Sequence, residues 1–135
     1  MNLQKGLVML EQGEIWTAPF PYYDNRKELQ VKIRPVIIVS KNKINANNLD
    51  VIICQISRHD QRRILKLPLE LKNKVLVITS DDLLPGAGVG LRNISIIKPF
   101  KLFTIPKDNL LKGKYIGELK QQTLQNLLNK IYNLF

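Results

Sequence analysis

Short apolar runs, rich in β-branched and aromatic residues, alternate with polar stretches through the first three quarters of the chain. Runs of this length and composition favour β-strands. They predict strands at 14–20, 34–40, 51–57, 64–70, 75–79, 91–98 and 101–105. The run at 34–40 is almost continuously apolar, as in a strand that is buried on both faces. We expect prolines to end the first strand at Pro19 and Pro21 and to separate the last two at Pro99.

The polar stretches between these runs predict loops and turns. Residues 21–32 are charged and indicate a long loop, and 41–50 form a second loop of Asn and Lys. Residues 80–82 are suited to cap a short helical turn at 83–84. The glycine-rich segment 85–90 predicts a flexible turn, because it lacks the Lys-Ser/Thr ending of a phosphate-binding loop.

The apolar period changes from that of a strand to that of a helix near the C-terminus. One stripe of a helix is formed by Leu124, Leu127, Leu128, Ile131 and Leu134, with Lys, Gln and Asn opposite. Many short strands followed by one helix predict a mainly β (α+β) fold, a small barrel with the C-terminal helix packed on it. The 135 residues fit one domain at 13–135, preceded by an N-terminal extension at 1–12.

The chain carries a large excess of positive charge. It has 21 Lys and Arg against 11 Asp and Glu, a formal net charge of +10. That charge attracts polyanions such as nucleic acid, an acidic protein segment or an anionic membrane. The alternative is a Lys-rich surface that serves only solubility. No stretch approaches the length of a membrane span and the N-terminus is a poor signal peptide, so we expect a cytoplasmic protein.

Classical catalytic groups are scarce. Cys54 is the only cysteine and lies in an apolar run, so we expect a buried, inert thiol and no internal disulfide. His59 is the only histidine, so no metal site is expected to rest on paired histidines. Asp81 and Asp82 are better suited to a helix cap than to a metal pair.

A constellation emerges from the pairing of the second and third predicted strands. If they are antiparallel across the loop between them, Ser40 faces Val51, and counting back places Arg34 opposite Ser57. His59 projects to the same face if its strand continues. These groups suffice for RNA cleavage, because the 2′-hydroxyl is the nucleophile and Arg stabilises the phosphorane oxygens. An Arg before Pro and a Ser at the end of a strand are also common in purely structural roles.

The first predicted loop mixes aromatic rings with cations. Such a mixture suits unstacked bases and their phosphates, and tyrosines that plug one end of a barrel are the alternative. The candidate RNA-binding residues are Tyr22, Tyr23, Asp24, Arg26, Lys27, Lys32 and Arg58.

Three segments, taken in order, resemble the PemK/MazF toxin family. They are 13–24 (GEIWTAPFPYYD), 33–40 (IRPVIIVS) and 50–57 (DVIICQIS). The later segments 95–98, 101–105 and 116–119 also fit, so the resemblance covers nearly everything after residue 12. It implies an SH3-like barrel, a homodimer and an endoribonuclease that cleaves single-stranded RNA or mRNA without metal or cofactor. Such toxins leave a 2′,3′-cyclic phosphate and a 5′-hydroxyl.

The resemblance also implies roles for particular residues. Arg34 and Ser57 match the catalytic Arg and Ser/Thr of the family. His59 has no firm counterpart, and we hypothesise that it transfers a proton, because an Arg side chain stays charged and is a poor base. The family partner is an antitoxin with an acidic tail, to which a basic surface is complementary.

The sequence also departs from the family pattern. The first loop lacks the Gly-rich stretch of many members, and 75–90 looks longer than usual. These departures leave the RNA target open and allow a barrel that binds nucleic acid without cutting it. A gyrase-poisoning toxin on the same fold is a further alternative, although the ending Tyr132–Phe135 lacks the expected Trp-Gly-Ile tail.

Overall fold

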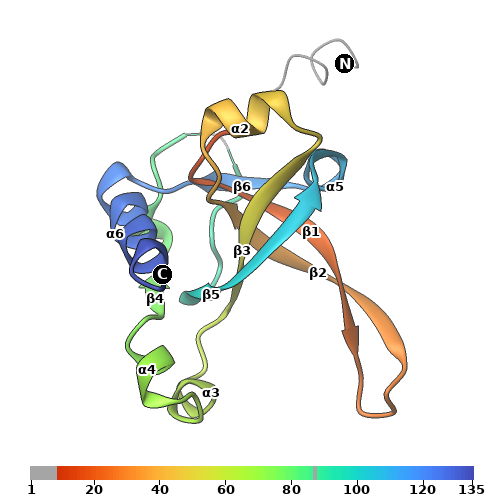
Figure 1. The fold of residues 1–135 in the computed structure, drawn as a ribbon, viewed down its shortest axis with the longest axis vertical. Coiled ribbons are helices and arrows are strands. Elements are labelled where there is room, and N and C mark those ends of the chain that lie inside the picture. Colours follow the sequence, from red (N-terminus) through yellow and green to blue (C-terminus); the bar gives the residue numbers. More distant parts are fainter. Residues whose placement is uncertain (1–8, 87) are drawn as a thin grey trace.

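The main feature of the computed structural model, which describes residues 9–86 and 88–135, is one curled antiparallel sheet (Figure 1). Its strands are β1 (Glu14–Tyr23), β2 (Leu29–Ile38), β3 (Asp50–Arg58), β4 (Leu76–Ile78), β5 (Ser95–Pro106) and β6 (Tyr115–Glu118). They lie in the order β4-β5-β3-β2-β1-β6. The mainly β fold predicted from the sequence is confirmed. The ladder is curled but does not close into a full barrel, because β4 and β6 remain its edges.

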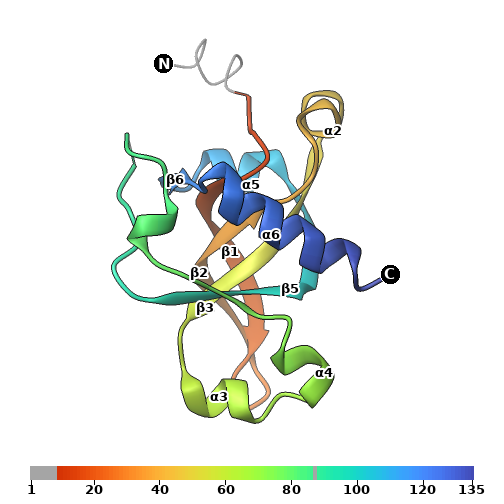
Figure 2. The same ribbon diagram turned by 90° about the vertical axis from the view of Figure 1, so that its left-hand side faces the viewer.

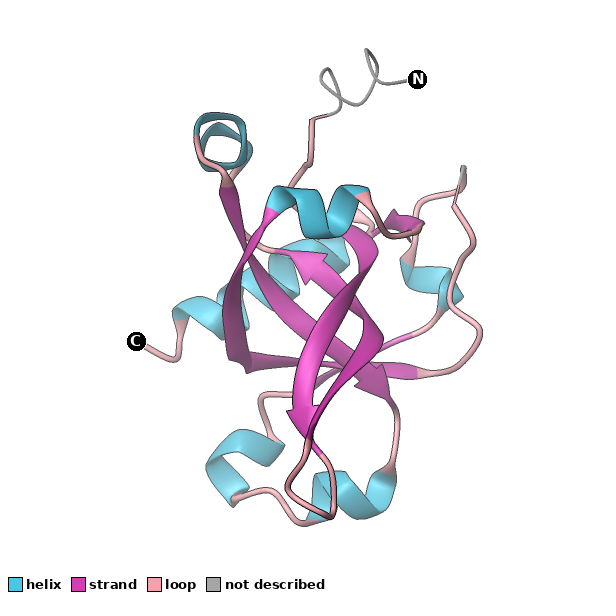
Figure 3. Ribbon diagram, turned by 90° about the vertical axis from the view of Figure 1, so that its right-hand side faces the viewer, coloured by secondary structure: helices cyan, strands magenta, loops and turns pink. Residues whose placement is uncertain are grey.

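Short helices connect the strands, and one longer helix covers the sheet (Figure 3). They are α2 (Asn42–Asn47), α3 (Gln61–Leu65), α4 (Leu69–Lys72), the 3₁₀ helix η1 (Ser80–Asp82), α5 (Lys107–Leu111) and α6 (Gln121–Tyr132). Helix α6 runs across one face of the sheet, as the apolar stripe predicts (Figure 2). Among the described helices, none is long and apolar enough to cross a membrane.

The core consists of two apolar clusters on opposite faces of the central strands. In β2, Ile37 belongs to the cluster under α6, whereas Val36 and Ile38 belong to the cluster on the other face. This alternation confirms that the strand is buried on both faces. Leu10 packs into the second cluster, so the described end of the predicted N-terminal extension contributes to the core. Residues 1–8 of that extension lie outside the described residues.

The prolines do not end the first strand. Strand β1 continues through Pro19 and Pro21 to Tyr23, paired with β2 throughout. Thr17 donates its N–H to Lys114 O at 2.9 Å, on the side of β6. Pro19 and Pro21 lie two and four residues after Thr17, so their backbone nitrogens face the same side of β1. They lie beyond the part of β1 that pairs with β6. The two prolines therefore lack N–H groups only where no ladder needs them.

The predicted loop at 21–32 is instead the end of a long β1–β2 hairpin. A tight turn at 24–28 joins the strands, with Asp24 N donating to Glu28 O at 3.0 Å. The Asp24 carboxylate accepts from the N–H groups of Arg26 at 2.8 Å and Glu28 at 3.0 Å. The charged sequence that suggested a loop belongs to a hairpin whose outer residues are solvated.

Three further predictions about local structure were wrong. In the segment 64–70, Leu65 lies in α3, Leu69 in α4 and Leu67 between the two helices. Asp60 caps α3 by accepting from Arg62 N at 3.0 Å. The loop predicted at 41–50 contains helix α2. Strand β5 begins at Ser95 and continues past Pro99, where a bulge replaces the predicted break.

Truncation in the α6 cluster is expected to destabilise the fold. Leu127 is fully buried between α6 and the sheet, so Leu127→Ala should lower the free energy of unfolding by roughly 2–5 kcal/mol. Chemical denaturation measures this change. On the same helix Tyr132 is 82% exposed, and Tyr132→Ala should change the same quantity by no more than about 0.5 kcal/mol. Equal losses for the two variants would contradict the packing of α6.

Candidate active site

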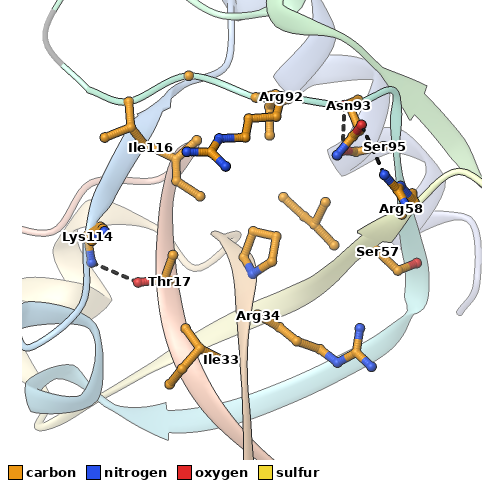
Figure 4. Close-up of a pocket in the computed structure, with 15 residues that line it drawn as sticks. Thr17, Ile33, Arg34, Ser57, Arg58, Arg92, Asn93, Ser95, Lys114 and Ile116 are labelled. Atoms are coloured by element: carbon orange, nitrogen blue, oxygen red, sulfur yellow. Dashed lines mark hydrogen bonds between the residues drawn. The ribbon is translucent and has the colours of Figure 1, made fainter.

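Arg34 and Ser57 lie beside the same two cavities, on the central strands β2 and β3. Strands β2 and β3 pair Val36 with Gln55 and Ile38 with Ile53, the register that the hairpin count predicts. The ladder ends at Val36 and Gln55, and the same register continued by two residues would set Arg34 opposite Ser57. Both residues line the same two cavities, and in Figure 4 their side chains extend from neighbouring strands toward the same side.

The larger cavity has a volume of about 520 Å³ and is lined by residues of β1, β2, β3 and β6 and of the segment 89–93. Its floor is apolar, with Ile56 and Ile116 among its residues, and its rim is cationic (Figure 4). The cations on that rim are Arg34, Arg58, Arg92 and Lys114. An apolar floor beneath a ring of cations is suited to a base and its neighbouring phosphates.

The smaller cavity has a volume of about 110 Å³ and is almost entirely polar. It is lined by Arg34, Gln55, Ser57, Arg63, Lys98 and Lys101. Four of these six side chains are cations, and they come from β2, α3 and β5. Among the described residues, no carboxylate lines either cavity. A space of this size and charge is suited to one phosphate group.

The bulge in β5 brings both lysines into the smaller cavity. From Cys54 to Ile56 strand β3 advances by two residues, whereas its partner β5 advances by five, from Ile97 to Leu102. The pair Ile56–Ile97, continued by one residue, would place Lys98 opposite Gln55. The pair Cys54–Leu102, continued by one residue from the other side of the bulge, would place Lys101 opposite Gln55. Because paired residues project to the same face, both lysines share the face of Ser57.

The positive charges around the smaller cavity act on one another. Burial lowers the pKa of Lys98 below its usual value, and the nearby charges of Lys101, Arg63 and Arg34 lower it further. In the described part of the chain one ion pair forms, between Arg63 Nε and the Asp60 carboxylate at 3.6 Å. The other cations of the cavity have no carboxylate partner there, so an incoming anion would relieve their repulsion.

Sequence comparison identifies the family of the chain. The profile of the PemK-like, MazF-like toxins of type II toxin–antitoxin systems matches residues 11–135. The chain belongs to this family. No curated protein sequence matches it.

Solved structures of such toxins share the fold at low sequence identity. A mycobacterial endoribonuclease in complex with its cognate antitoxin is 18% identical, with a TM-score of 0.62 over 93% of this chain and 91% of that one. MazE-MazF from Deinococcus radiodurans is 14% identical, with a TM-score of 0.60 over 94% and 96%. Mycobacterium tuberculosis toxin MazF-mt6 is 20% identical, with a TM-score of 0.60 over 89% and 93%. At these identities the likeness establishes the fold.

The structure of this PemK/MazF-like toxin does not bring His59 into either cavity. Strand β3 ends at Arg58, so the strand does not continue to carry His59 to the face of Ser57. Instead the His59 N–H donates to Ile94 O at 2.9 Å, and its side chain lies outside the residues that line the two cavities. Arg58 does line the larger cavity, where its Nη2 donates to Asn93 Oδ1 at 3.3 Å.

The candidate RNA-binding residues of the first predicted loop lie on the projecting hairpin (Figure 1). Tyr22 and Tyr23 are 41% and 73% exposed, so they do not plug the sheet. Phe20 is buried against Phe103, with ring centroids 5.3 Å apart. Lys32 is two residues from Arg34 and therefore shares its face of β2.

The turn of the hairpin holds the other three candidates of that loop. Asp24 bonds backbone N–H groups of the turn, which gives it a structural role there. Arg26 and Lys27 follow it in the same turn and are exposed.

Sequence reasoning missed most of the cations that surround Ser57. Arg63 lay just before a segment predicted as a strand, and Lys98 and Lys101 flanked a predicted break. Arg92 and Lys114 reach the larger cavity from segments with no predicted chemistry. The available signal was the sequence Lys-Pro-Phe-Lys, since a proline inside a strand indicates a bulge.

Other reactive groups lie outside the two cavities. The carboxylates of Glu11, Glu14 and Glu118 lie within 4.8 Å of one another, near the start of β1. Burial raises the pKa of Glu14, whose Oε1 accepts from Trp16 Nε1 at 3.2 Å. None of the three lines either cavity.

The thiol of Cys54 should be inert in the folded protein. It is fully buried, and burial raises its pKa to about 12, so the thiolate is almost absent at pH 8. Ellman's reagent should therefore leave the folded toxin unlabelled at pH 8 and label one thiol per chain in guanidinium chloride. Rapid labelling without denaturant would contradict this burial.

Proposed function

We propose that this toxin is a metal-independent endoribonuclease that cleaves single-stranded RNA through attack by the 2′-hydroxyl. The observation that carries the proposal is the position of Arg34 and Ser57 on the shared wall of two cation-lined cavities. Membership of the PemK/MazF toxin family supports it, as do related folds whose names describe endoribonucleases. Since none of the described residues that line either cavity is acidic, a divalent metal would find no carboxylate ligand among them.

In this reaction the RNA supplies its own nucleophile, and the protein contributes mainly positive charge and the positioning of the phosphate. The 2′ oxygen attacks the adjacent phosphorus, the bond from phosphorus to the 5′ oxygen breaks, and the products are a 2′,3′-cyclic phosphate and a 5′-hydroxyl. Arg34 binds the phosphorane oxygens in two-pronged fashion as negative charge develops. The Ser57 hydroxyl donates a hydrogen bond to the same phosphoryl group from the neighbouring strand.

The remaining cations would hold RNA on both sides of the scissile phosphate. In the larger cavity Arg58, Arg92 and Lys114 bind flanking phosphates while a base rests on the apolar floor. On the hairpin, Tyr23 offers an exposed ring on which a base stacks, and Lys32 extends the positive surface.

The partners follow from the same charge. We propose that a cognate antitoxin with an acidic segment occupies the cationic cavities and thereby excludes RNA, as a net charge of +10 favours. We also propose that the toxin is a cytoplasmic homodimer, like other members of its family. A non-catalytic RNA-binding protein is the rival that the first experiment excludes or supports.

Removal of the central cation should abolish most of the activity. Purified toxin is incubated with a long single-stranded RNA of mixed sequence in EDTA, and the fragments are examined for cyclic phosphate ends. Arg34→Ala should slow cleavage by about 10²- to 10³-fold, because one donor to the phosphorane is lost. Ser57→Ala should be slower than wild type for the same reason.

The control is Lys43→Ala, which removes one positive charge from α2, away from both cavities. It should cleave at the wild-type rate. RNA that is bound tightly but left intact by wild type would contradict a nuclease and favour the binding protein. Cleavage that needs added Mg²⁺ would contradict a metal-independent reaction.

The exposed tyrosine of the hairpin should contribute to RNA affinity. Tyr23→Ala should raise the Kd for 2′-O-methyl RNA, which lacks the nucleophile, by about 5- to 150-fold, since stacking on one base is worth roughly 1–3 kcal/mol. Fluorescence anisotropy measures the Kd. Tyr132→Ala removes another exposed tyrosine, from helix α6 far from the hairpin, and should leave the Kd unchanged (Figure 1). Equal Kd values for both variants and wild type would exclude the hairpin from RNA binding.

A further inference from the structure

The proposed reaction needs a group that takes the proton of the 2′-hydroxyl. Arg34 stays protonated at any working pH, and the Ser57 hydroxyl is a weak base. His59 lines neither cavity. Of the described residues that line the smaller cavity, only Lys98 and Lys101 carry an amine, the one kind of side chain there that is strongly basic when neutral and still exchanges its proton.

The two lysines differ in their surroundings. Lys101 is exposed, whereas Lys98 is partly buried where β5 leaves its regular ladder with β3. The ladder continued from Ile97 sets Lys98 on the face of Gln55 and Ser57, and Lys98 lines one cavity with Ser57 and Arg34. A phosphate held in this small space lies next to all three groups.

Among the described residues, the charged side chains that act on Lys98 are all positive. Lys101 faces it from the same strand, Arg63 from α3 and Arg34 from β2, while β3 contributes the neutral side chains of Gln55 and Ser57. Burial and these three cations destabilise its ammonium form and lower its pKa. The neutral amine is therefore more populated than that of an exposed lysine.

We propose, on the basis of the ribonuclease function above, that Lys98 is a catalytic residue whose neutral amine accepts the proton of the attacking 2′-hydroxyl. The oxygen–hydrogen electron pair forms the new bond from the 2′ oxygen to phosphorus. The bond from phosphorus to the 5′ oxygen breaks, and its electron pair leaves on the 5′ oxygen. That oxygen takes a proton from water, the resulting hydroxide takes the proton from Lys98, and the amine is restored.

Bound substrate would strengthen this base. A phosphodiester brings one negative charge into a cavity of four cations, which favours the ammonium form and raises the pKa of Lys98 again. In the free toxin the neutral amine of Lys98 is thus more populated than that of an exposed lysine, and it gains basicity as the phosphorane forms. The pKa of Lys98 in the free toxin governs how kcat/KM depends on pH. We expect kcat/KM to rise with pH and to level off at a pH below about 10.4, the pKa of an unperturbed lysine.

The experiment compares Lys98→Arg with wild type, because arginine keeps the positive charge but does not lose its proton. Initial rates on a long single-stranded RNA at low substrate give kcat/KM from pH 6 to 10. We expect Lys98→Arg to lose about 10²- to 10⁴-fold in kcat/KM at the pH where the wild-type value levels off. Its kcat/KM should also no longer rise with pH. Its Kd for 2′-O-methyl RNA should stay within about threefold of wild type. Lys43→Arg, on α2, is the control and should keep both the rate and the profile.

A second variant separates the proton from the charge. Lys98→Ala should be slow, and added ethylamine should restore part of its rate in proportion to the concentration of the neutral amine. Lys98→Arg with the wild-type rate and pH profile would overturn the inference, even if Arg34→Ala is inactive, and would leave the proposed function standing. Wild-type toxin that binds RNA without cutting it would overturn the proposed function, and this inference with it.

Discussion

The pairing of β2 with β3 is the constraint on which the rest of the structure depends. Val36, Ile37 and Ile38 are buried on both faces of the sheet, so a slip of one residue would drive each of them into the wrong cluster. That penalty fixes the register, and the register brings Arg34 and Ser57, each two residues beyond the last pair of the ladder, to the same cavities. The position of the candidate active site is therefore set by apolar packing, although every group in it is polar.

This dependence explains what the sequence could predict. Apolar runs reveal the central strands, and counting across one hairpin yields the observed register of β2 with β3, because both strands are local and strongly patterned. The helical stripe of α6 is visible for the same reason. Lys98 and Arg63 could not be found in this way, because their positions depend on a bulge and on a short capped helix. The prolines of β1 led to a wrong prediction of the strand's end. A strand accepts a proline only where its backbone nitrogen faces no partner strand, and the sequence does not show where the pairing of β1 with β6 ends.

The cations of the smaller cavity destabilise the folded protein and at the same time favour the binding of an anion. Four cations share about 110 Å³, and among the described residues only Asp60 pairs with one of them. Their mutual repulsion disfavours the folded state and would be relieved by any polyanion that enters. RNA and an acidic antitoxin segment meet the same demand, so one surface would serve both. Competition between the two partners would then need no conformational change in the toxin.

The bulge shows how one strand satisfies two requirements. On both sides of it β5 keeps regular pairing with β3, and the buried residues Ile97 and Cys54 continue the core. Between them the ladder is interrupted, so Pro99 costs no hydrogen bond and the extra residues carry lysine to the cavity on either side of it. A regular strand would present only one of Lys98 and Lys101 opposite Gln55. The interruption gives the cavity a second cation while the packed ladder around it holds both in place.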